Sequence, residues 1–115
     1  MDLETLKALE ANAAAETKSS LRHYHLGLAA VQLKKTCQHG EWMPCLRANG
    51  LDQNRINRAM RFAKRLSEEQ CQILPILVAE RLVKLIRKNP TRNMAVLTEE
   101  AWAEYRQYRK SGEFH

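Results

Sequence analysis

Apolar residues recur every three or four positions along most of this chain. The clearest stripe runs through residues 21–37 and consists of Leu21, Tyr24, Leu28, Val31 and Leu33. Apolar side chains at this spacing share one face of an α-helix. No stretch alternates apolar and polar residues as a half-buried strand would, and turn-forming residues are scarce, with four Gly and three Pro. The pattern predicts an all-α protein.

The helical spacing is weaker near the N-terminus. Leu3, Leu6 and Leu9 lie roughly on one face, but an Ala-rich stretch and two serines follow them. Residues 1–20 are therefore expected to form a short helix or a loosely held arm. The rest of the chain, residues 21–115, is expected to form a single helical domain, since a chain of 115 residues is the size of one domain.

Local signals divide the middle of the chain into helices. Gly40 is the residue expected in a left-handed cap just past the first long helix, and Pro44 suits the first turn of a short helix that follows. Asp52 is a favourable N-cap for a helix from about residue 53 to 66. One face of that helix is apolar and consists of Ile56, Ala59, Met60, Ala63 and Leu66.

Further helices are predicted beyond residue 66. Ser67 and Gln70 have the spacing of a capping box. Pro75 then either kinks this helix or starts a new one that runs to about Lys88. A last helix is expected to be capped by Thr98 and to carry an aromatic packing stripe of Trp102, Tyr105 and Tyr108.

Positive charge is concentrated in one segment. The net charge is +6, from 19 Lys and Arg against 13 Asp and Glu. Residues 47–66 contain six cations and one acid, which gives +5, whereas residues 1–20 carry four acids and two cations, which gives −2. A local excess of positive charge favours an acidic partner, of which nucleic acid is the commonest.

The basic segment belongs to a stretch with the layout of a helix-turn-helix unit, residues 41–66. In such units two helices are joined by a short turn, and the second helix reads DNA. Gly50 falls in the expected turn. The positions that hold the two helices together are apolar and are occupied by Cys45, Leu46, Leu51, Ile56 and Ala59. Leu46 departs from the usual pattern, because a small residue is common there.

The second helix of this unit is the predicted DNA-binding site. Arg pairs bidentately with guanine and Asn with adenine in the major groove, and both side chains also bind phosphate. The residues expected to reach base edges are Asn54, Arg55, Asn57 and Arg58. Those expected to bind phosphate are Arg61, Lys64 and Arg65. The alternative is an ordinary surface helix with a solvated basic face.

Between about Leu26 and Leu66 the chain contains the motifs HLGLAAVQLKK, His39-Gly40-Glu41-Trp42, Leu46 with Asn49-Gly50, and Asn57-Arg58-Ala59-Met60. These motifs resemble a domain family of unknown function that is common in phage, plasmid and other mobile-element proteins. The family signature is His-Gly-x-Trp followed by a helix-turn-helix-like segment. The resemblance covers roughly a third of the chain. It implies a helical, DNA-binding protein of a phage or plasmid.

The histidines and cysteines are too scattered to predict a metal site. Cys37, His39 and Cys45 are near one another in sequence, but no Cys-x-x-Cys occurs. His23 and His25 are two residues apart and therefore point to different faces of a helix. No metal or other cofactor is expected.

The sequence also gives no catalytic centre. His39, Glu41 and Cys37 contain acid, base and nucleophile chemistry, but no further group orients them as a triad. No enzyme activity is expected. The N-terminus lacks the features of a signal peptide, the apolar run ILPILVAERLVKLI is too charged to span a membrane, and three cysteines suit a reducing compartment. A cytoplasmic protein is expected.

The same apolar run is either a buried core helix or a dimer interface. If it mediates a homodimer, the interface residues are expected to be Leu77, Leu82, Leu85 and Ile86. A two-fold DNA reader doubles its contacts with DNA, which favours this arrangement. A second basic patch would then be formed by Arg81, Lys84, Arg87 and Lys88.

Two functions of different classes follow from these observations. The first is a helix-turn-helix protein that binds double-stranded DNA as a transcriptional regulator or DNA-processing accessory of a phage, plasmid or other mobile element. The second is a phage-encoded inhibitor that uses its basic surface to bind a host protein, such as a nucleic-acid-handling or defence complex. RNA binding or a purely architectural role is a third, weaker reading.

Overall fold

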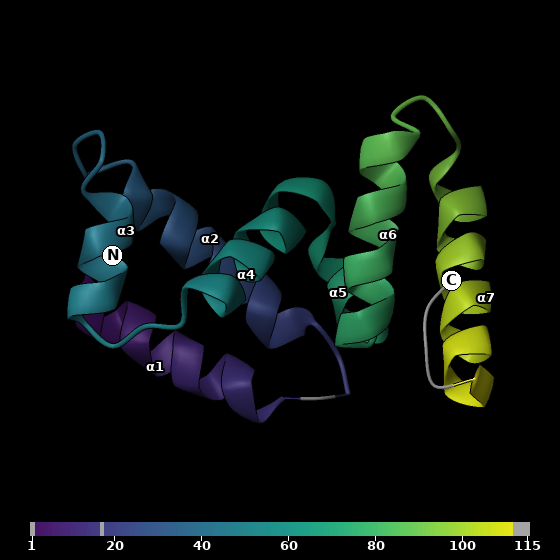
Figure 1. Cartoon of the computed structure of the whole chain (residues 1–115), viewed down its shortest axis with the longest axis horizontal. Helices are drawn as coiled ribbons and strands as arrows, with labels where there is room; N and C mark the ends of the chain where they lie inside the picture. The colour runs from purple at the N-terminus through teal and green to yellow at the C-terminus, as the bar shows by residue number, and fades with distance from the viewer. Residues whose placement is uncertain (1, 17, 112–115) are drawn as a thin grey trace.

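Seven α-helices and no strand make up the residues that the computed structural model describes, 2–16 and 18–111 (Figure 1). This confirms the all-α prediction. The helices are α1 (Leu3–Ala15), α2 (Leu21–Lys34), α3 (Trp42–Ala48), α4 (Gln53–Arg65), α5 (Glu68–Ile73), α6 (Ile76–Lys88) and α7 (Met94–Ser111).

Helix α4 crosses the middle of the molecule and belongs to both of its hydrophobic cores. Its first half contributes Ile56, Ala59 and Met60 to a core shared with α1, α2 and α3. Its last half contributes Phe62, followed by Leu66, to a second core shared with α5, α6 and α7. In Figure 1, α1 and α3 accordingly lie toward one end of the molecule, and α6 and α7 toward the other. The basic helix is therefore the element that joins the two cores.

Helices α2 and α4 make the most extensive helix pair, and they approach closely at Gly27. A Cβ atom on Gly27 would lie 2.0 Å from the carbonyl oxygen of Ala59 and 2.5 Å from its carbonyl carbon. Both of these atoms belong to the backbone and cannot rotate away. Glycine is thus required in α2 for α4 to lie directly on it.

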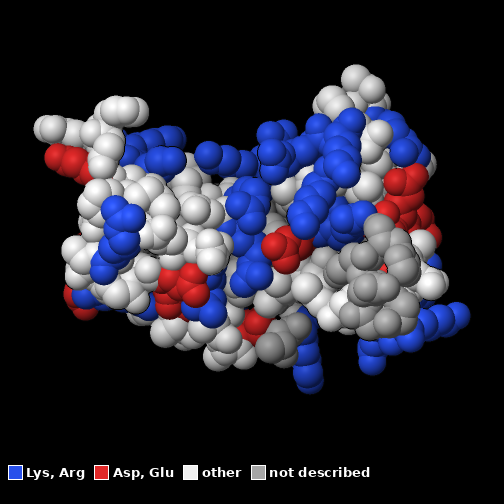
Figure 2. All heavy atoms as spheres, viewed as in Figure 1, with Lys and Arg blue, Asp and Glu red and all other residues white. Residues whose placement is uncertain are grey.

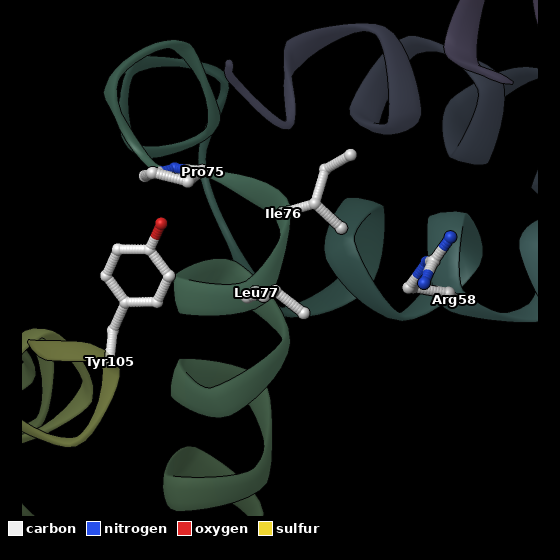
Figure 3. Close-up of a pocket in the computed structure, with 5 residues that line it drawn as sticks. All are labelled: Arg58, Pro75, Ile76, Leu77 and Tyr105. Carbon is white, nitrogen blue, oxygen red and sulfur yellow. The ribbon is translucent and has the colours of Figure 1, made fainter. Parts of the chain in front are cut away.

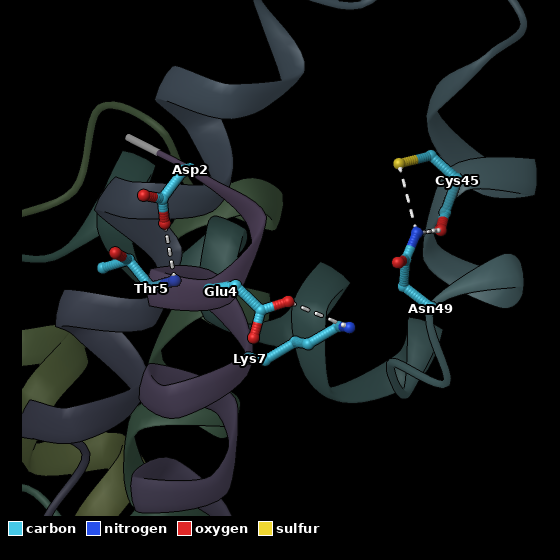
Figure 4. A network of polar contacts seen from close by, with 6 residues as sticks. All are labelled: Asp2, Glu4, Thr5, Lys7, Cys45 and Asn49. Carbon is cyan, nitrogen blue, oxygen red and sulfur yellow. Dashed lines mark hydrogen bonds and ion pairs between the residues drawn. The ribbon is translucent and has the colours of Figure 1, made fainter.

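Helix α1 packs on α2 as a regular helix over Leu3–Ala15. Leu6 and Ala13 are fully buried. The carboxylate of Asp2 caps the helix by accepting the backbone N–H of Thr5 at 2.8 Å (Figure 4). Burial of one apolar face stabilises a short helix more than its own propensity does.

The caps predicted for α4 and α5 are both present. Asp52 accepts the backbone N–H of Arg55 at 3.1 Å. Ser67 and Gln70 form a reciprocal capping box, with bonds of 3.1 and 2.8 Å. Each cap satisfies backbone donors that the first helical turn leaves unpaired.

Two glycines with a left-handed backbone flank α3. Gly50, with φ of +70°, lies in the turn to α4, and just before it the Asn49 side chain donates to the Cys45 carbonyl oxygen at 2.8 Å (Figure 4). Gly40 has φ of +84°. The prediction that Gly40 caps the preceding helix is wrong, because α2 already ends at Lys34. Gly40 instead shapes the turn that leads into α3.

Pro75 starts a new helix rather than kinking an old one, since it is the N-cap of α6. The predicted start of the last helix is wrong. Helix α7 begins at Met94, where Asn93 Oδ1 accepts the N–H of Ala95 at 2.7 Å. Thr98 lies inside the helix, and its hydroxyl donates to the Met94 carbonyl oxygen at 2.8 Å.

Helix α6 buries most of its apolar face within this chain. Leu82 is fully buried and Leu85 is 9% exposed, both in the second core. The proposed dimer interface is therefore wrong for these two leucines, because they pack against other helices of the same molecule. Ile86 is partly buried, and Leu77 is 38% exposed.

Candidate nucleic-acid interface

The outward face of α4 carries amides and cations along its whole length. Asn54, Asn57, Arg61 and Lys64 follow one another at helical spacing, and Arg65 lies beside the last of them. The opposite face holds the residues buried against α2, so the outward stripe is fixed by the core. Asn54, Lys64 and Arg65 are exposed, and Asn57 and Arg61 are partly buried.

Arg55, one of the residues expected to reach base edges, is held by carboxylates of the chain itself. Its Nη1 atom lies 3.6 Å from Glu10 Oε1, on α1, and 3.8 Å from Asp52 Oδ2. The Arg55 and Glu10 side chains are 26% and 15% exposed. The arginine thus links α4 to α1. Its guanidinium is held by two carboxylates of the same chain and does not extend freely outward.

Arg58 is engaged in the same way from the other flank. Its Nη1 atom lies 3.7 Å from Glu80 Oε2 of α6, and its Nε atom is buried. Arg58 also lines a cavity of about 330 Å³ together with Pro75, Ile76, Leu77 and Tyr105 (Figure 3). Its side chain therefore borders a hollow with apolar walls while its charge pairs with Glu80.

The structure thus separates the seven predicted site residues into two groups. Arg55 and Arg58 make internal ion pairs. The other five have no internal salt bridge among the described residues and follow the outward face: Asn54, Asn57, Arg61, Lys64 and Arg65. The two amides come first along the helix, and the three cations follow them.

Figure 2 shows that Lys and Arg side chains gather over α4 and α6 on one face of the molecule, with few acidic atoms among them. A surface of this kind produces a positive potential that attracts polyanions. The acids near this surface do not neutralise it evenly. Three of them, Glu10, Asp52 and Glu80, already form ion pairs with Arg55 and Arg58.

His23, considered above only as a metal ligand, lies in the core close to these arginines. It is 1% exposed, and its ring centroid is 6.1 Å from that of Phe62. Burial, together with the nearby positive charges of Arg58 and Arg55, lowers the pKa of His23 to about 4. The imidazole is therefore neutral at physiological pH and does not add to the basic surface.

A short turn that contains Gly50 joins α3 to α4. Leu46, Leu51, Ile56 and Ala59 are buried, and Cys45 is partly buried. The main support of α4, however, is α2, and α3 makes a smaller contact with it. The apolar spacing around the turn did not predict that α4 packs on α2. The signal in the sequence is Gly27, because a glycine within a helical pattern indicates close backbone approach.

The described residues hold no group of three or more His, Cys, Asp or Glu that could bind a metal ion. Cys71 is fully buried, and its burial raises the pKa of its thiol. His39 is exposed in the turn before α3, whereas Trp42 is buried in the first core. Of the described helices, none is both long and apolar enough to span a lipid bilayer.

Comparisons of the chain with protein-family models, with curated proteins and with solved structures gave no match. The functional argument therefore depends on the chemistry of this surface.

Proposed function

We propose that this protein binds double-stranded DNA through the outward face of α4. The observation that carries the proposal is the row of cations on that face, Arg61, Lys64 and Arg65, which form no salt bridge within the described residues and follow two amides on one helix. Cations of this kind bind backbone phosphates and release counterions from DNA. The amides of Asn54 and Asn57 are placed to contact base edges or sugar–phosphate groups.

The ion pairs of Arg55 and Arg58 refine the mode of binding. Both arginines are held by carboxylates on neighbouring helices, so base contacts fall to the two asparagines rather than to arginine. Phosphate contacts then supply most of the affinity, and they carry no sequence information. We therefore infer semi-specific binding, in which Asn54 and Asn57 provide the sequence preference.

The biological role that fits this activity is that of a regulator or DNA-processing accessory of a phage, plasmid or other mobile element. Support for the role comes from the His39-Gly40-Glu41-Trp42 motif and the segment that follows it. The short α3–α4 connection with a left-handed Gly50 agrees with a helix-turn-helix unit.

The proposal is tested by fluorescence anisotropy with a labelled duplex and the variant R61Q/K64Q/R65Q. Glutamine preserves the length and helix propensity of the side chains while removing three charges. The matched control is R106Q/R109Q/K110Q, which removes three charges from the exposed end of α7. We expect the α4 variant to bind at least roughly tenfold more weakly at 0.1 M salt, and the control to bind much more like the wild type.

Two outcomes count against the proposal. One is a wild-type protein that does not bind duplex DNA at low salt. The other is an equal loss of affinity in the two variants, which would mean that total charge rather than the α4 surface determines binding. Capture of a host protein that is lost in the α4 variant, with no DNA binding by the wild type, would favour the inhibitor function instead.

A further inference from the structure

A second row of cations lies along α6 and takes no part in the site on α4. Lys84, Arg87 and Lys88 are exposed and follow Glu80 at intervals that keep all four on one side of the helix. The other side of α6 is buried in the second core. None of these three cations forms a salt bridge within the described residues.

The three side chains border an open hollow of about 320 Å³, and among the described residues they alone line it. Lys84 also lines a smaller hollow of about 180 Å³ beside it, together with Leu77, Glu80 and Arg81. Like charges around one space repel each other, and no carboxylate of the described residues lines the larger hollow to offset them. The arrangement is thus complementary to an external anion with several oxygen acceptors.

The ion pair between α6 and α4 shows where this row lies relative to α4. Glu80 lies on the same side of α6 as Lys84 and reaches Arg58 on α4, 3.7 Å away. The cationic side of α6 therefore continues from the flank of α4. Figure 2 agrees with this, because Lys and Arg side chains over α4 and α6 are visible on the same face of the molecule.

We infer that Lys84, Arg87 and Lys88 form a second phosphate-binding site, which holds the backbone of the same duplex that α4 contacts. This inference rests on the proposed function of α4. The described residues that line the site are all cations, so it binds phosphate groups and does not read bases. Its role is to fix the orientation of the duplex over α4 and to add affinity that is independent of sequence.

The test is the salt dependence of duplex binding by the full chain and by the variant K84Q/R87Q/K88Q. For B-DNA, the slope of log affinity against log salt changes by about 0.9 for each phosphate contact. We expect the variant to lower the magnitude of the slope by about 2 to 3 and to bind roughly tenfold or more weakly at 0.1 M salt. The control is again R106Q/R109Q/K110Q, whose slope should stay within about 0.5 of the wild-type value.

The outcomes separate this inference from the proposed function. If the wild type binds, the α4 variant is weak, and K84Q/R87Q/K88Q matches the control, the α6 site is refuted and the α4 site stands. If the wild type binds no duplex, both proposals fail. Circular dichroism and thermal unfolding of all variants verify that the helices are intact, as expected because the three substituted residues are exposed.

Discussion

Glu80 controls how far Arg58 can extend from α4. The two side chains are 28% and 27% exposed, and their ion pair holds the guanidinium toward α6 instead of toward a ligand. A pair this accessible to solvent contributes on the order of 1 kcal/mol or less to stability, so the fold does not depend on it. Its main effect is on which cations of α4 are available.

Replacing Glu80 by Gln is therefore expected to strengthen DNA binding. The variant frees the Arg58 charge and removes an anion beside the interface, which together are worth roughly a threefold to tenfold gain in affinity at 0.1 M salt. The control is Glu100→Gln on α7, which removes an acid whose Oε1 atom lies 2.7 Å from Nη2 of Arg92. Both variants are compared with the wild type by anisotropy. A gain of the same size in the control would show that net charge alone is responsible.

His23 makes the stability of the protein depend on pH. Its pKa is about 4 in the folded chain, below the ordinary value of 6.5, so the unfolded chain binds more protons between these values. Stability is therefore complete above pH 6.5 and falls as the pH drops toward 4. The charged imidazole cannot be accommodated beside Phe62 and under two arginines without cost.

Urea unfolding measures this effect directly. Between pH 7.5 and pH 5 the wild type is expected to lose about 2 kcal/mol of stability through His23. The variant His23→Leu has no imidazole to protonate and should lose much less over the same range. His25→Gln is the control on the same helix, since His25 is 43% exposed, and it should behave like the wild type. Equal pH dependence in the wild type and His23→Leu would contradict the assignment.

At the scale of the helices, the contact between α2 and α4 depends on one missing side chain. Alanine normally stabilises a helix relative to glycine by about 0.5 to 1 kcal/mol. At Gly27 the sign should be reversed, because the added Cβ would overlap the Ala59 backbone. We expect Gly27→Ala to destabilise the protein by about 1 to 3 kcal/mol, as overpacking does in other cores.

The matched control for this prediction is an exposed position of the same helix. Gln32 lies on the outer side of α2, so Gln32→Ala should leave the urea midpoint nearly unchanged. If Gly27→Ala proved as stable as the wild type, α2 and α4 would have to lie further apart than described.

The elements that the sequence predicted well are those fixed by neighbouring residues. The Asp52 cap and the Ser67–Gln70 capping box join groups three residues apart, so their spacing is enough to identify them. The start of α7 was missed because two capping signals are close together in sequence. Asn93 caps the helix, and Thr98 bonds to a carbonyl one turn back.

The features that could not be predicted arise from contacts between distant parts of the chain. The partners of Arg55 and Arg58 are Glu10 and Glu80, which come from helices far away in sequence. Whether an arginine on a basic helix is free depends on such partners. The sequence therefore located the candidate surface on α4, but the division into paired and unpaired cations required the packing of α1 and α6 against it.

At the scale of the whole molecule, α4 is held between two cores, and this makes it a rigid platform. Ile56 and Ala59 are fully buried in the first core, and Phe62 is fully buried in the second. A surface helix supported in this way keeps its outward side chains at fixed spacing, which lowers the entropy lost on binding a regular duplex. Lys and Arg side chains over α6 lie on the same face of the molecule as those over α4 (Figure 2).

The central claim, that the outward face of α4 contacts duplex DNA, is tested most directly by an NMR titration of the ¹⁵N-labelled protein with a short duplex. The largest shift changes are expected at Asn54, Asn57, Arg61 and Lys64, with smaller ones at Lys84 and its neighbours on α6. The exposed end of α7 should remain unperturbed. Changes confined to α7 or α3, or no changes at duplex excess in low salt, would contradict the claim.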